Sequence, residues 1–222
     1  MSRLLDLLFP PRCALCHGAV CGGAQVCDIC ATEIQEQYLI QKGMPIAGCT
    51  DARAALQYKG KVRRALLSCK YGQKNVIGAW GGGRITACLL EHLPEWKPDC
   101  MTYVPTTLGH WWKRGFNLPT IFAREAARQC GLPCICTLRR KWFAKSQLRT
   151  HSAQDRQKNA GETYFPCKGI NLTGKRIVLV DDVLTTGATA AACATILREM
   201  GAAEVFFVSL AKSQNKRKSA EK

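Results

Sequence analysis

The stretch "IVLVDDVLTTGATA", residues 177–190, passes from four apolar residues through two adjacent carboxylates to threonine, glycine and alanine. Residues 176–180 predict a buried strand, and residues 188–200 predict a helix that ends at Gly201. A further apolar segment, 205–210, predicts a second strand. Strand, helix and strand in so few residues indicate a parallel βαβ unit with a right-handed crossover. The stretch therefore predicts an α/β fold built on a parallel sheet.

The turn between this strand and this helix has the composition of a phosphate site. Asp181 and Asp182 lie at the carboxyl end of the predicted strand, where open parallel sheets bind ligands. Residues 185–189 open the helix, whose free backbone N–H groups and dipole suit a phosphate. Adjacent carboxylates accept hydrogen bonds from hydroxyl groups and hold Mg²⁺, so the predicted ligand is a ribose 5-phosphate. The alternative is that the aspartates cap the helix and the threonines form the turn.

The segment "VLVDDVLTTGAT", residues 178–189, resembles the motif of type I phosphoribosyltransferases that binds 5-phosphoribosyl 1-pyrophosphate (PRPP). In that family the loop binds the 5-phosphate and the acidic pair binds the ribose hydroxyls. The resemblance implies that Asp181 and Asp182 are the catalytic acidic pair and that Mg²⁺ accompanies PRPP. The PRPP-binding residues implied here are Asp181, Asp182, Val183, Leu184, Thr185, Thr186, Gly187, Ala188 and Thr189.

Two other glycine-containing segments do not predict a phosphate site. Residues 173–176 contain Gly-Lys, but they precede the strand and lack the Ser or Thr that follows Lys in a P-loop. Gly81, Gly82 and Gly83 do not continue into the dinucleotide fingerprint, because position 86 is Thr.

Four cysteines near the N-terminus have the spacing of a zinc site. Cys13 and Cys16 form one C-x₂-C pair, and Cys27 and Cys30 form a second pair ten residues further on. Four thiolate ligands leave no open coordination position, so the Zn²⁺ predicted here is structural. Buried reduced thiols or a redox pair are the alternatives, and His17 or Cys21 could replace one ligand.

The composition divides the chain into three parts. Residues 1–45 are rich in cysteine, glycine and proline and predict a small zinc-ribbon domain, residues 46–212 predict the main domain, and residues 213–222 predict a basic disordered tail. In the main domain, residues 141–160 are polar and aperiodic, which is typical of a lid loop or a hairpin. Further helices are expected at 63–71, 85–93 and 114–129, and a further strand at 99–104.

The chain carries a formal net charge of +16, which favours polyanionic partners such as nucleic acid, polyphosphate or an acidic membrane surface. The excess lies in two clusters, and a solvated face that serves solubility is the alternative. The clusters are Arg53, Lys59, Lys61, Arg63, Arg64, Lys70 and Lys74, and then Arg139, Arg140, Lys141, Lys145, Arg149, Arg156 and Lys158.

Motifs along nearly the whole chain resemble those of the ComF/GntX family. Besides the cysteine motif they are "YKGKVRRALLSCKY" at 58–71, "VPTTLGHWWKRGFN" at 104–117 and "QLRTHSAQDRQKNAGETYF" at 147–165. The resemblance implies a type I phosphoribosyltransferase-like, Rossmann-type parallel sheet with an N-terminal Cys₄ zinc ribbon. It also implies a part in taking up transforming single-stranded DNA. Partners would be single-stranded DNA and other competence proteins, such as a DNA-translocating helicase.

The same resemblance assigns the remainder of the pocket. Pro105 and Thr106 would form the pyrophosphate loop, with Lys113 and Arg114 adding positive charge, although an ordinary βα turn with exposed cations is the alternative. A lid over the diphosphate would exclude water and bring cations to it. The lid residues are Lys141, Lys145, Gln147, Arg156 and Asn159.

Fourteen cysteines in a chain of 222 residues, with no export signal or membrane span in the pattern, predict a cytoplasmic protein with reduced thiols. Peripheral attachment to a membrane surface stays open. Three functions are compatible with these features: a PRPP-binding factor in DNA uptake, a salvage or biosynthetic phosphoribosyltransferase that transfers the pentosyl group of PRPP to a base or amine, and a non-catalytic PRPP sensor that binds nucleic acid.

Overall fold

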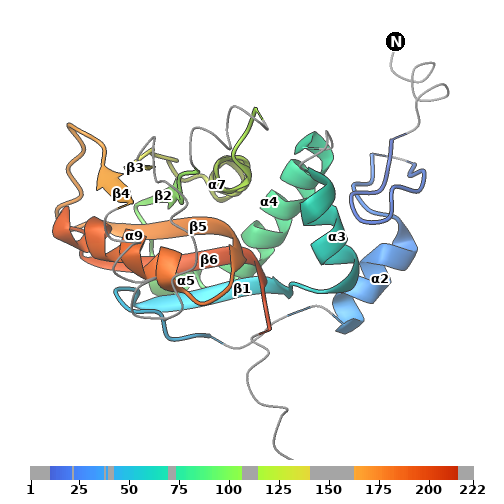
Figure 1. Ribbon diagram of the computed structural model, residues 1–222, viewed down its shortest axis with the longest axis horizontal. Coiled ribbons are helices and arrows are strands. Elements are labelled where there is room, and N and C mark those ends of the chain that lie inside the picture. Colours follow the sequence, from blue (N-terminus) through green and yellow to red (C-terminus); the bar gives the residue numbers. More distant parts are fainter. Residues whose placement is uncertain are drawn as a thin grey trace, which may run out of the picture.

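The computed structural model describes residues 11–21, 23–37, 39, 43–69, 74–106, 115–140 and 163–214. Its centre is a four-stranded sheet in the order β1-β6-β5-β2, in which all neighbouring strands are parallel (Figure 1). A separate antiparallel pair joins β3 to β4. The parallel-sheet α/β fold predicted from the sequence is confirmed. The strands are β1 (Asp51–Gln57), β2 (Cys100–Tyr103), β3 (Leu138–Arg140), β4 (Tyr164–Pro166), β5 (Arg176–Leu184) and β6 (Glu204–Lys212).

The predicted βαβ unit consists of β5, helix α9 (Ala188–Glu199) and β6. The sequence pattern predicted that the first strand ends at Val180, but β5 stays paired with β6 as far as Leu184, opposite Lys212. Asp181 and Asp182 therefore lie inside the last part of β5, and the turn into α9 begins after them. Gly201 follows the helix with a φ of +95°, as expected for a residue that ends a helix in the left-handed region.

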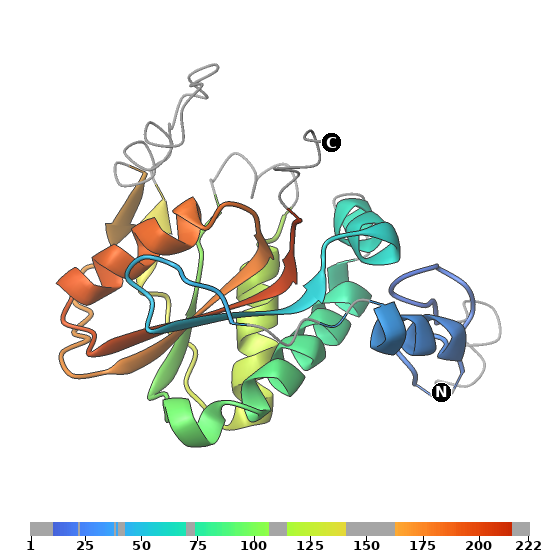
Figure 2. The same cartoon turned by 90° about the horizontal axis from the view of Figure 1, so that it is seen from below.

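Side chains of β5 alternate between two layers of the molecule. Ile177 and Leu179 are buried in the cluster that contains α9, whereas Val178 and Val180 belong to the cluster on the opposite face. That second cluster includes the apolar residues of α4 (Lys74–Leu90) and α7 (Leu118–Cys130). Figure 2 shows α9 on one side of the strands and α4 with α7 on the other. Because both faces are covered, residues 177–180 of β5 form a continuous apolar run.

The remaining helices are α2 (Asp28–Gln37) in the cysteine-rich segment, α3 (Gly60–Ser68) and α5 (Leu93–Trp96). Two elements differ from the sequence expectation. The pattern predicts no strand at β1, whose Ala52, Ala54 and Ala55 have low strand propensity, yet parallel pairing with β6 makes it an edge of the sheet. Helix α7 begins at Leu118 instead of residue 114, with Pro119 in its first turn.

Glycines inside α4 let α7 approach it closely. A Cβ atom on Gly78 would lie 2.5 Å from Cγ2 of Ile121, and one on Gly81 would overlap the ring of Phe122. The pattern predicted this helix only over residues 85–93 because glycine disfavours helix, whereas α4 begins at Lys74. Packing against α7 therefore offsets the low propensity.

Gly81→Ala is expected to lower the free energy of unfolding by about 1–3 kcal/mol, because the new methyl group displaces Phe122 in a packed core. The matched variant is Gly83→Ala, where a Cβ would meet no described atom within 4 Å. That variant is expected to leave stability unchanged or to raise it by up to about 1 kcal/mol. Chemical denaturation measures both values, and equal effects would contradict the close packing of the two helices.

Candidate functional site

The two adjacent aspartates lie where β5 approaches its carboxyl end. Asp181 is only 9% exposed and Asp182 is half-buried. The N–H of Asp182 donates to Oδ1 of Asp181 (2.8 Å), and the N–H of Val183 donates to Oδ1 of Asp182 (2.7 Å). Neither carboxylate caps α9, since among the described residues no side chain caps the helix at Gly187. The helix-cap alternative is therefore not the arrangement found.

The two carboxylates influence the pKa values of thiols in different layers of the molecule. The charge of Asp181 contributes to raising the pKa of the Cys193 thiol in α9, after burial, which is the larger cause. The charge of Asp182 contributes in the same way to the raised pKa of Cys69, at the end of α3. The pair thus spans the end of the sheet between α9 and α3.

Burial raises the pKa of the Asp181 carboxyl well above its ordinary value, and the negative charge of Asp182 raises it further. The hydrogen bond from the Asp182 N–H and the positive charge of Arg140 oppose this rise. A carboxyl in such surroundings is stabilised by a hydroxyl donor or a cation beside it. These are the groups that a sugar diol or a bound divalent ion supplies.

A cavity of about 360 Å³ brings the acidic pair together with residues from several other parts of the chain. Of the predicted site residues, Pro105, Thr106, Val183 and Thr189 line it with the two aspartates. The other lining residues are Tyr58, Leu66, Leu67, Val104, Phe116, Asn117, Leu118, Pro119, Arg140 and Tyr164.

The predicted phosphate turn lies next to this cavity. Leu184 is buried, whereas Thr185 and Thr186 are exposed. Gly187 has a φ of +83°, a conformation that favours glycine, and Ala188 begins the helix. Within the turn, the N–H of Ala188 donates a long hydrogen bond to Oγ1 of Thr186 (3.4 Å). The N–H groups at the start of α9 are thus placed to bind an anion.

Arg140 and Tyr164 are lining residues that the sequence analysis did not assign to the pocket. They are paired across β3 and β4, and the guanidinium carbon of Arg140 lies 5.3 Å from the centre of the Tyr164 ring. The Arg140 Nε is buried and has no hydrogen-bond partner among the described residues. A cation so placed suits the phosphate or diphosphate of a ligand. Its only sequence signal is membership of the second basic cluster.

Asn117 connects the loop after β2 to α7. Its Nδ2 donates to the carbonyl of Val104 (3.1 Å) and to Oγ1 of Thr120 (2.8 Å). A second cavity of about 550 Å³ shares Pro105, Thr106, Phe116, Asn117 and Arg140 with the first. It is further lined by Tyr103, Gly115, Thr120, Ile121, Arg124, Cys136, Leu138 and Arg139.

Several predicted site residues lie outside the described residues. They are Lys113 and Arg114 of the pyrophosphate loop and the lid residues Lys141, Lys145, Gln147, Arg156 and Asn159.

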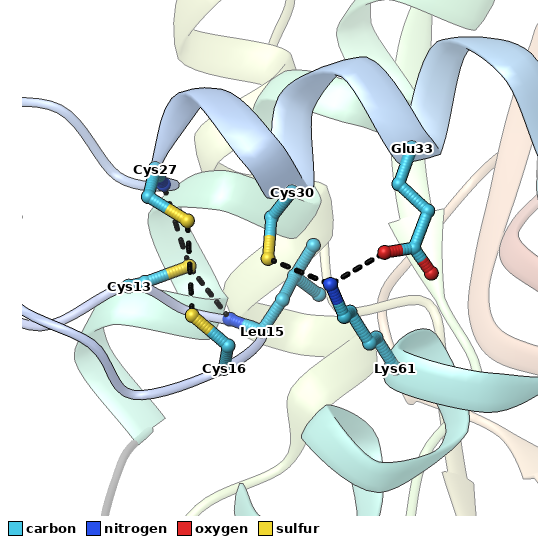
Figure 3. Close-up of polar contacts among 7 residues, drawn as sticks. All are labelled: Cys13, Leu15, Cys16, Cys27, Cys30, Glu33 and Lys61. Carbon is cyan, nitrogen blue, oxygen red and sulfur yellow. Dashed lines mark hydrogen bonds and ion pairs between the residues drawn. The ribbon is translucent and has the colours of Figure 1, made fainter.

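The four predicted zinc ligands come together at the start of α2 (Figure 3). The Sγ atoms of Cys13, Cys16, Cys27 and Cys30 all lie within 4.8 Å of one another. The backbone N–H groups of Leu15 and Cys27 each donate to Sγ of Cys13 at 3.4 Å. Four sulfur atoms at this separation, with N–H groups directed at one of them, fit tetrahedral Zn²⁺. His17 and Cys21 do not belong to this group.

The thiols of this group also differ in acidity. Burial and then the neighbouring thiols of Cys27 and Cys16 raise the pKa of Cys30 to about 12. Burial opposes ionisation of Cys13 as well, but backbone N–H donors outweigh it and lower its pKa to about 6. Four thiolates so close together need a cation to compensate their charge. The cluster therefore supports a structural zinc ion.

Two protein families match this chain in different segments. Residues 120–222 match the family described as phosphoribosyl transferase domain, and residues 4–44 match the double zinc ribbon domain. The second segment contains five cysteines and one histidine, enough for one site with four such ligands but too few for two. Both parts of the predicted architecture, the type I phosphoribosyltransferase fold and the zinc ribbon, are confirmed.

Curated relatives include a competence protein and DNA utilization proteins. The chain is 28% identical to Competence protein F of Haemophilus influenzae over 117 residues, which cover 52% of this chain and 51% of that protein. It is 31% identical to the DNA utilization protein YhgH of Escherichia coli over 116 residues, covering 49% and 47%. The chain thus spans about half the length of these relatives. A shorter match, 58% identical over 38 residues, covers 17% of this chain and 21% of the adenine phosphoribosyltransferase of Mycobacterium avium.

Solved structures with a related chain path are phosphoribosyltransferases and an amidotransferase. A purine phosphoribosyltransferase from Pyrococcus horikoshii aligns with 24% identity and a TM-score of 0.36, over 60% of this chain and 73% of that one. The glutamine PRPP amidotransferase of B. subtilis aligns with 21% identity and a TM-score of 0.45, over 65% and 30%. In the part of the chain that the structure describes, no helix is long and apolar enough to cross a membrane.

Proposed function

We propose that the chain is a ComF-like protein that binds PRPP with Mg²⁺ and takes part in the uptake of transforming single-stranded DNA. Two findings support this proposal: the chain joins a zinc ribbon to a phosphoribosyltransferase domain, and it is similar to Competence protein F. The observation that carries the PRPP site is one cavity lined by Asp181, Asp182 and Thr189 together with Pro105 and Thr106. An acidic pair, a helix start and a second loop at the end of a parallel sheet supply the groups that a phosphorylated sugar needs.

Each part of the ligand has a partner in this proposal. The ribose hydroxyls donate to Asp181 and Asp182, and the 5-phosphate accepts from the N–H groups that open α9. The diphosphate would lie near Pro105 and Thr106, with Arg140 as a cation that lines the same cavity. Mg²⁺ would be held by the diphosphate and the carboxylates and would neutralise part of the charge. Lys113, Arg114 and the lid residues would complete the site.

PRPP with Mg²⁺ is expected to raise the melting temperature of the protein, because it binds the folded state only. A ligand at 100 times its Kd stabilises by about 2.7 kcal/mol, which is a shift of roughly 5–10 °C for a domain of this size. The double variant Asp181→Asn with Asp182→Asn should lose the shift, and thermal scanning with and without PRPP measures it. The control is Asp99→Asn, a carboxylate that pairs with Lys175 at the opposite end of β5 and should retain the shift. An unchanged response in the double variant would remove the site assignment.

A transferase reaction is the second candidate, favoured by the short match to adenine phosphoribosyltransferase. The bond from the anomeric carbon to the pyrophosphate oxygen would break, and a nitrogen of the acceptor would form the new bond. In that reaction the protein acts by positioning and electrostatic stabilisation, without a nucleophilic side chain. Release of pyrophosphate in the presence of candidate bases or amines distinguishes this function from a PRPP sensor that binds without turnover.

Single-stranded DNA is the proposed macromolecular ligand. The net charge of +16 favours it, and the second cavity places Tyr103 and Phe116 beside Arg124 and Arg139. Aromatic rings next to cations are typical of grooves that hold single strands by base stacking and phosphate contacts. Among the described residues no carboxylate forms an ion pair with either of these two arginines. The protein would act in the cytoplasm, with competence proteins such as a DNA-translocating helicase as partners.

Binding of a fluorescent oligodeoxythymidine is expected to weaken as the salt concentration rises. In a plot of log affinity against log salt concentration, each phosphate that the protein neutralises should contribute a slope of about −0.7. Arg139→Ala should weaken binding and lower the slope by about that amount if this side chain contacts one phosphate. Arg128→Ala is the control, because Arg128 already pairs with Glu125 on the surface of α7. Anisotropy titrations at several salt concentrations measure the slope. Affinity that does not depend on salt would contradict binding of the DNA phosphates by the positive charge, and the charge would then serve solubility alone.

A further inference from the structure

The zinc ribbon packs against α3, and the two share one apolar core. Leu15 and Ile34 of the ribbon are buried in the same cluster as Val62, Ala65 and Leu66 of α3. Figures 1 and 2 both show α2 and the chain around the cysteines lying beside α3. The ribbon is therefore in contact with α3, a helix that comes after β1 and is separated from the ribbon in the sequence.

One polar contact connects the metal ligands themselves to α3. Lys61, in the first turn of α3, places its Nζ 3.6 Å from Sγ of Cys30 and forms an ion pair with Glu33 of α2 (Figure 3). Cys30 is 1% exposed, and the side chains of Lys61 and Glu33 are 22% and 24% exposed. The ammonium group is therefore held between a zinc ligand and a carboxylate at a mostly closed interface.

A lysine in this position has a chemical reason to matter when zinc is bound. A zinc-bound cysteine is a thiolate, and a cluster of four thiolates around Zn²⁺ carries a net charge of about −2. An ammonium N–H that donates to one sulfur offsets part of that charge and orients the ligand. Contacts of this kind usually change metal affinity by about 10-fold to 100-fold when they are removed.

The other end of α3 reaches the cavity of the acidic pair. Leu66 and Leu67 line that cavity, and Cys69 follows the helix. Burial first, and the charge of Asp182 second, raise the pKa of Cys69 to about 12, which places this thiol near the acidic pair. Lys61 and Leu67 are separated by six residues of helix, or about 9 Å. One rigid element therefore touches the zinc cluster at its start and the cavity at its end.

We propose that Lys61 is a positioning residue that couples the zinc centre to the PRPP cavity: it holds the start of α3 against zinc-bound Cys30, so that metal occupancy sets the position of the cavity wall formed by Leu66 and Leu67. The proposal rests on the PRPP site of the proposed function. It gives the zinc ribbon a role in ligand binding in addition to the stability of its own fold.

The test uses the full chain loaded with zinc and the variants Lys61→Met, which keeps the apolar stem, and Lys61→Arg, which keeps a cationic donor. Lys175→Met is the matched control, because Lys175 also pairs with a carboxylate but contacts Asp99 at the far end of the sheet. Competition with a chromophoric chelator gives zinc affinity, and the charge-transfer bands of Co²⁺-substituted protein report the thiolates. Calorimetry gives the PRPP affinity, and hydrogen exchange reports α3.

Lys61→Met is expected to weaken zinc affinity by about 10-fold and to move the thiolate-to-Co²⁺ bands to lower energy, because a thiolate without its donor is more easily oxidised. With zinc saturating, it should weaken PRPP binding by at least about 5-fold and speed exchange in α3. Lys61→Arg should restore most of each value, and Lys175→Met should change none.

Unchanged PRPP affinity in zinc-saturated Lys61→Met, when the wild type binds PRPP, would overturn the coupling and leave the proposed function intact. A wild type that does not bind PRPP would instead overturn the proposed function. In that case hydrogen exchange in α3 tests whether zinc and Lys61 hold the start of this helix. If the exchange rate is the same with and without zinc, and with and without the Lys61 side chain, the proposed role of Lys61 is overturned too.

Discussion

Removal of zinc by a chelator is expected to unfold the segment around Cys13, Cys16, Cys27 and Cys30 and to lower the melting temperature of the whole chain by about 10–20 °C. Structural zinc contributes apparent free energies of roughly 10–16 kcal/mol in small zinc domains, and much of this is offset by the cost of ordering the segment that holds the metal. A net loss of about 5 kcal/mol corresponds to this temperature shift in a chain of about 200 residues. Circular dichroism with and without chelator, followed by zinc repletion, measures it.

The effect extends beyond the ribbon because, among the described residues, the buried apolar side chains of the ribbon belong to the same cluster as those of α3. Leu15, Val20 and Ile34 are buried in the same cluster as Val62 and Leu66 of α3. When the four thiolates lose their cation, these side chains lose the scaffold that holds them against α3. Hydrogen exchange is therefore expected to rise in α2 first and in α3 next, while β5 and β6 remain protected.

Two variants separate metal loss from loss of a thiol. Cys13→Ser should reproduce the chelator effect, whereas Cys21→Ser should retain one zinc ion per chain, because the exposed Cys21 lies outside the four-sulfur group. Metal analysis by mass spectrometry gives the stoichiometry. Two zinc ions per chain, or a stable Cys13→Ser variant that still holds zinc, would contradict the Cys₄ site.

The features that the sequence predicted well have their determinants close together in the chain. The zinc ligands form two C-x₂-C pairs, and the acidic pair, the turn and the start of α9 occupy residues 181–189. Strand β5 and helix α9 also follow directly from local apolar periodicity. In each of these cases the chemistry depends on neighbours in sequence, which a pattern can report.

The features that the sequence did not predict depend on contacts between distant segments. Arg140 and Tyr164 reach the cavity because β3 pairs with β4 across residues that share no motif. Strand β1 is rich in alanine and is specified by pairing with β6. Gly81, which the sequence pattern placed in neither a ligand loop nor a helix, belongs to a helix that α7 packs against closely. Pairing partners and close approaches of this kind have no local signal.

The contact of Lys61 with Cys30 illustrates the same limit in the charge pattern. Lys61 belongs to the first basic cluster of the sequence, which predicts affinity for polyanions. In the structure its ammonium group pairs with Glu33, and this ion pair is the main cause that raises the pKa of Lys61. A net charge therefore overstates the cations available to a nucleic acid, because part of it serves an internal interface.

Asp181→Asn is expected to have opposite effects on function and stability. It should abolish PRPP binding, because an amide cannot accept from two ribose hydroxyls as a carboxylate does or hold Mg²⁺. Without ligand, the same variant should be more stable than the wild type at neutral pH by about 1–3 kcal/mol, the usual cost of a buried charge or polar group that lacks full compensation. The amide oxygen can still accept from the N–H of Asp182, so the local backbone bond is kept.

The dependence on pH tests the cause of this gain. Burial and the charge of Asp182 raise the pKa of Asp181 in the folded state above its ordinary value of 3.8. Between these two values the folded state binds more protons than the unfolded state, so wild-type stability falls as pH rises through that interval. The stability difference between Asp181→Asn and wild type should therefore be small near pH 4, grow with pH, and level off above the folded pKa.

Asp182→Asn is the matched control for this measurement, because Asp182 is half-buried and its Oδ1 accepts from the N–H of Val183 in the same manner. Its stability without ligand should exceed that of wild type by less than the stability of Asp181→Asn does, because the substitution removes the repulsion between the two charges but leaves the Asp181 carboxyl buried. Urea denaturation at intervals of one pH unit, without ligand or divalent ions, gives the three curves. A constant difference at all pH values would mean that the gain of Asp181→Asn comes from packing. In that event, the buried charge of Asp181 would not lower the stability of the protein, and a bound sugar or cation would have no such destabilisation to relieve.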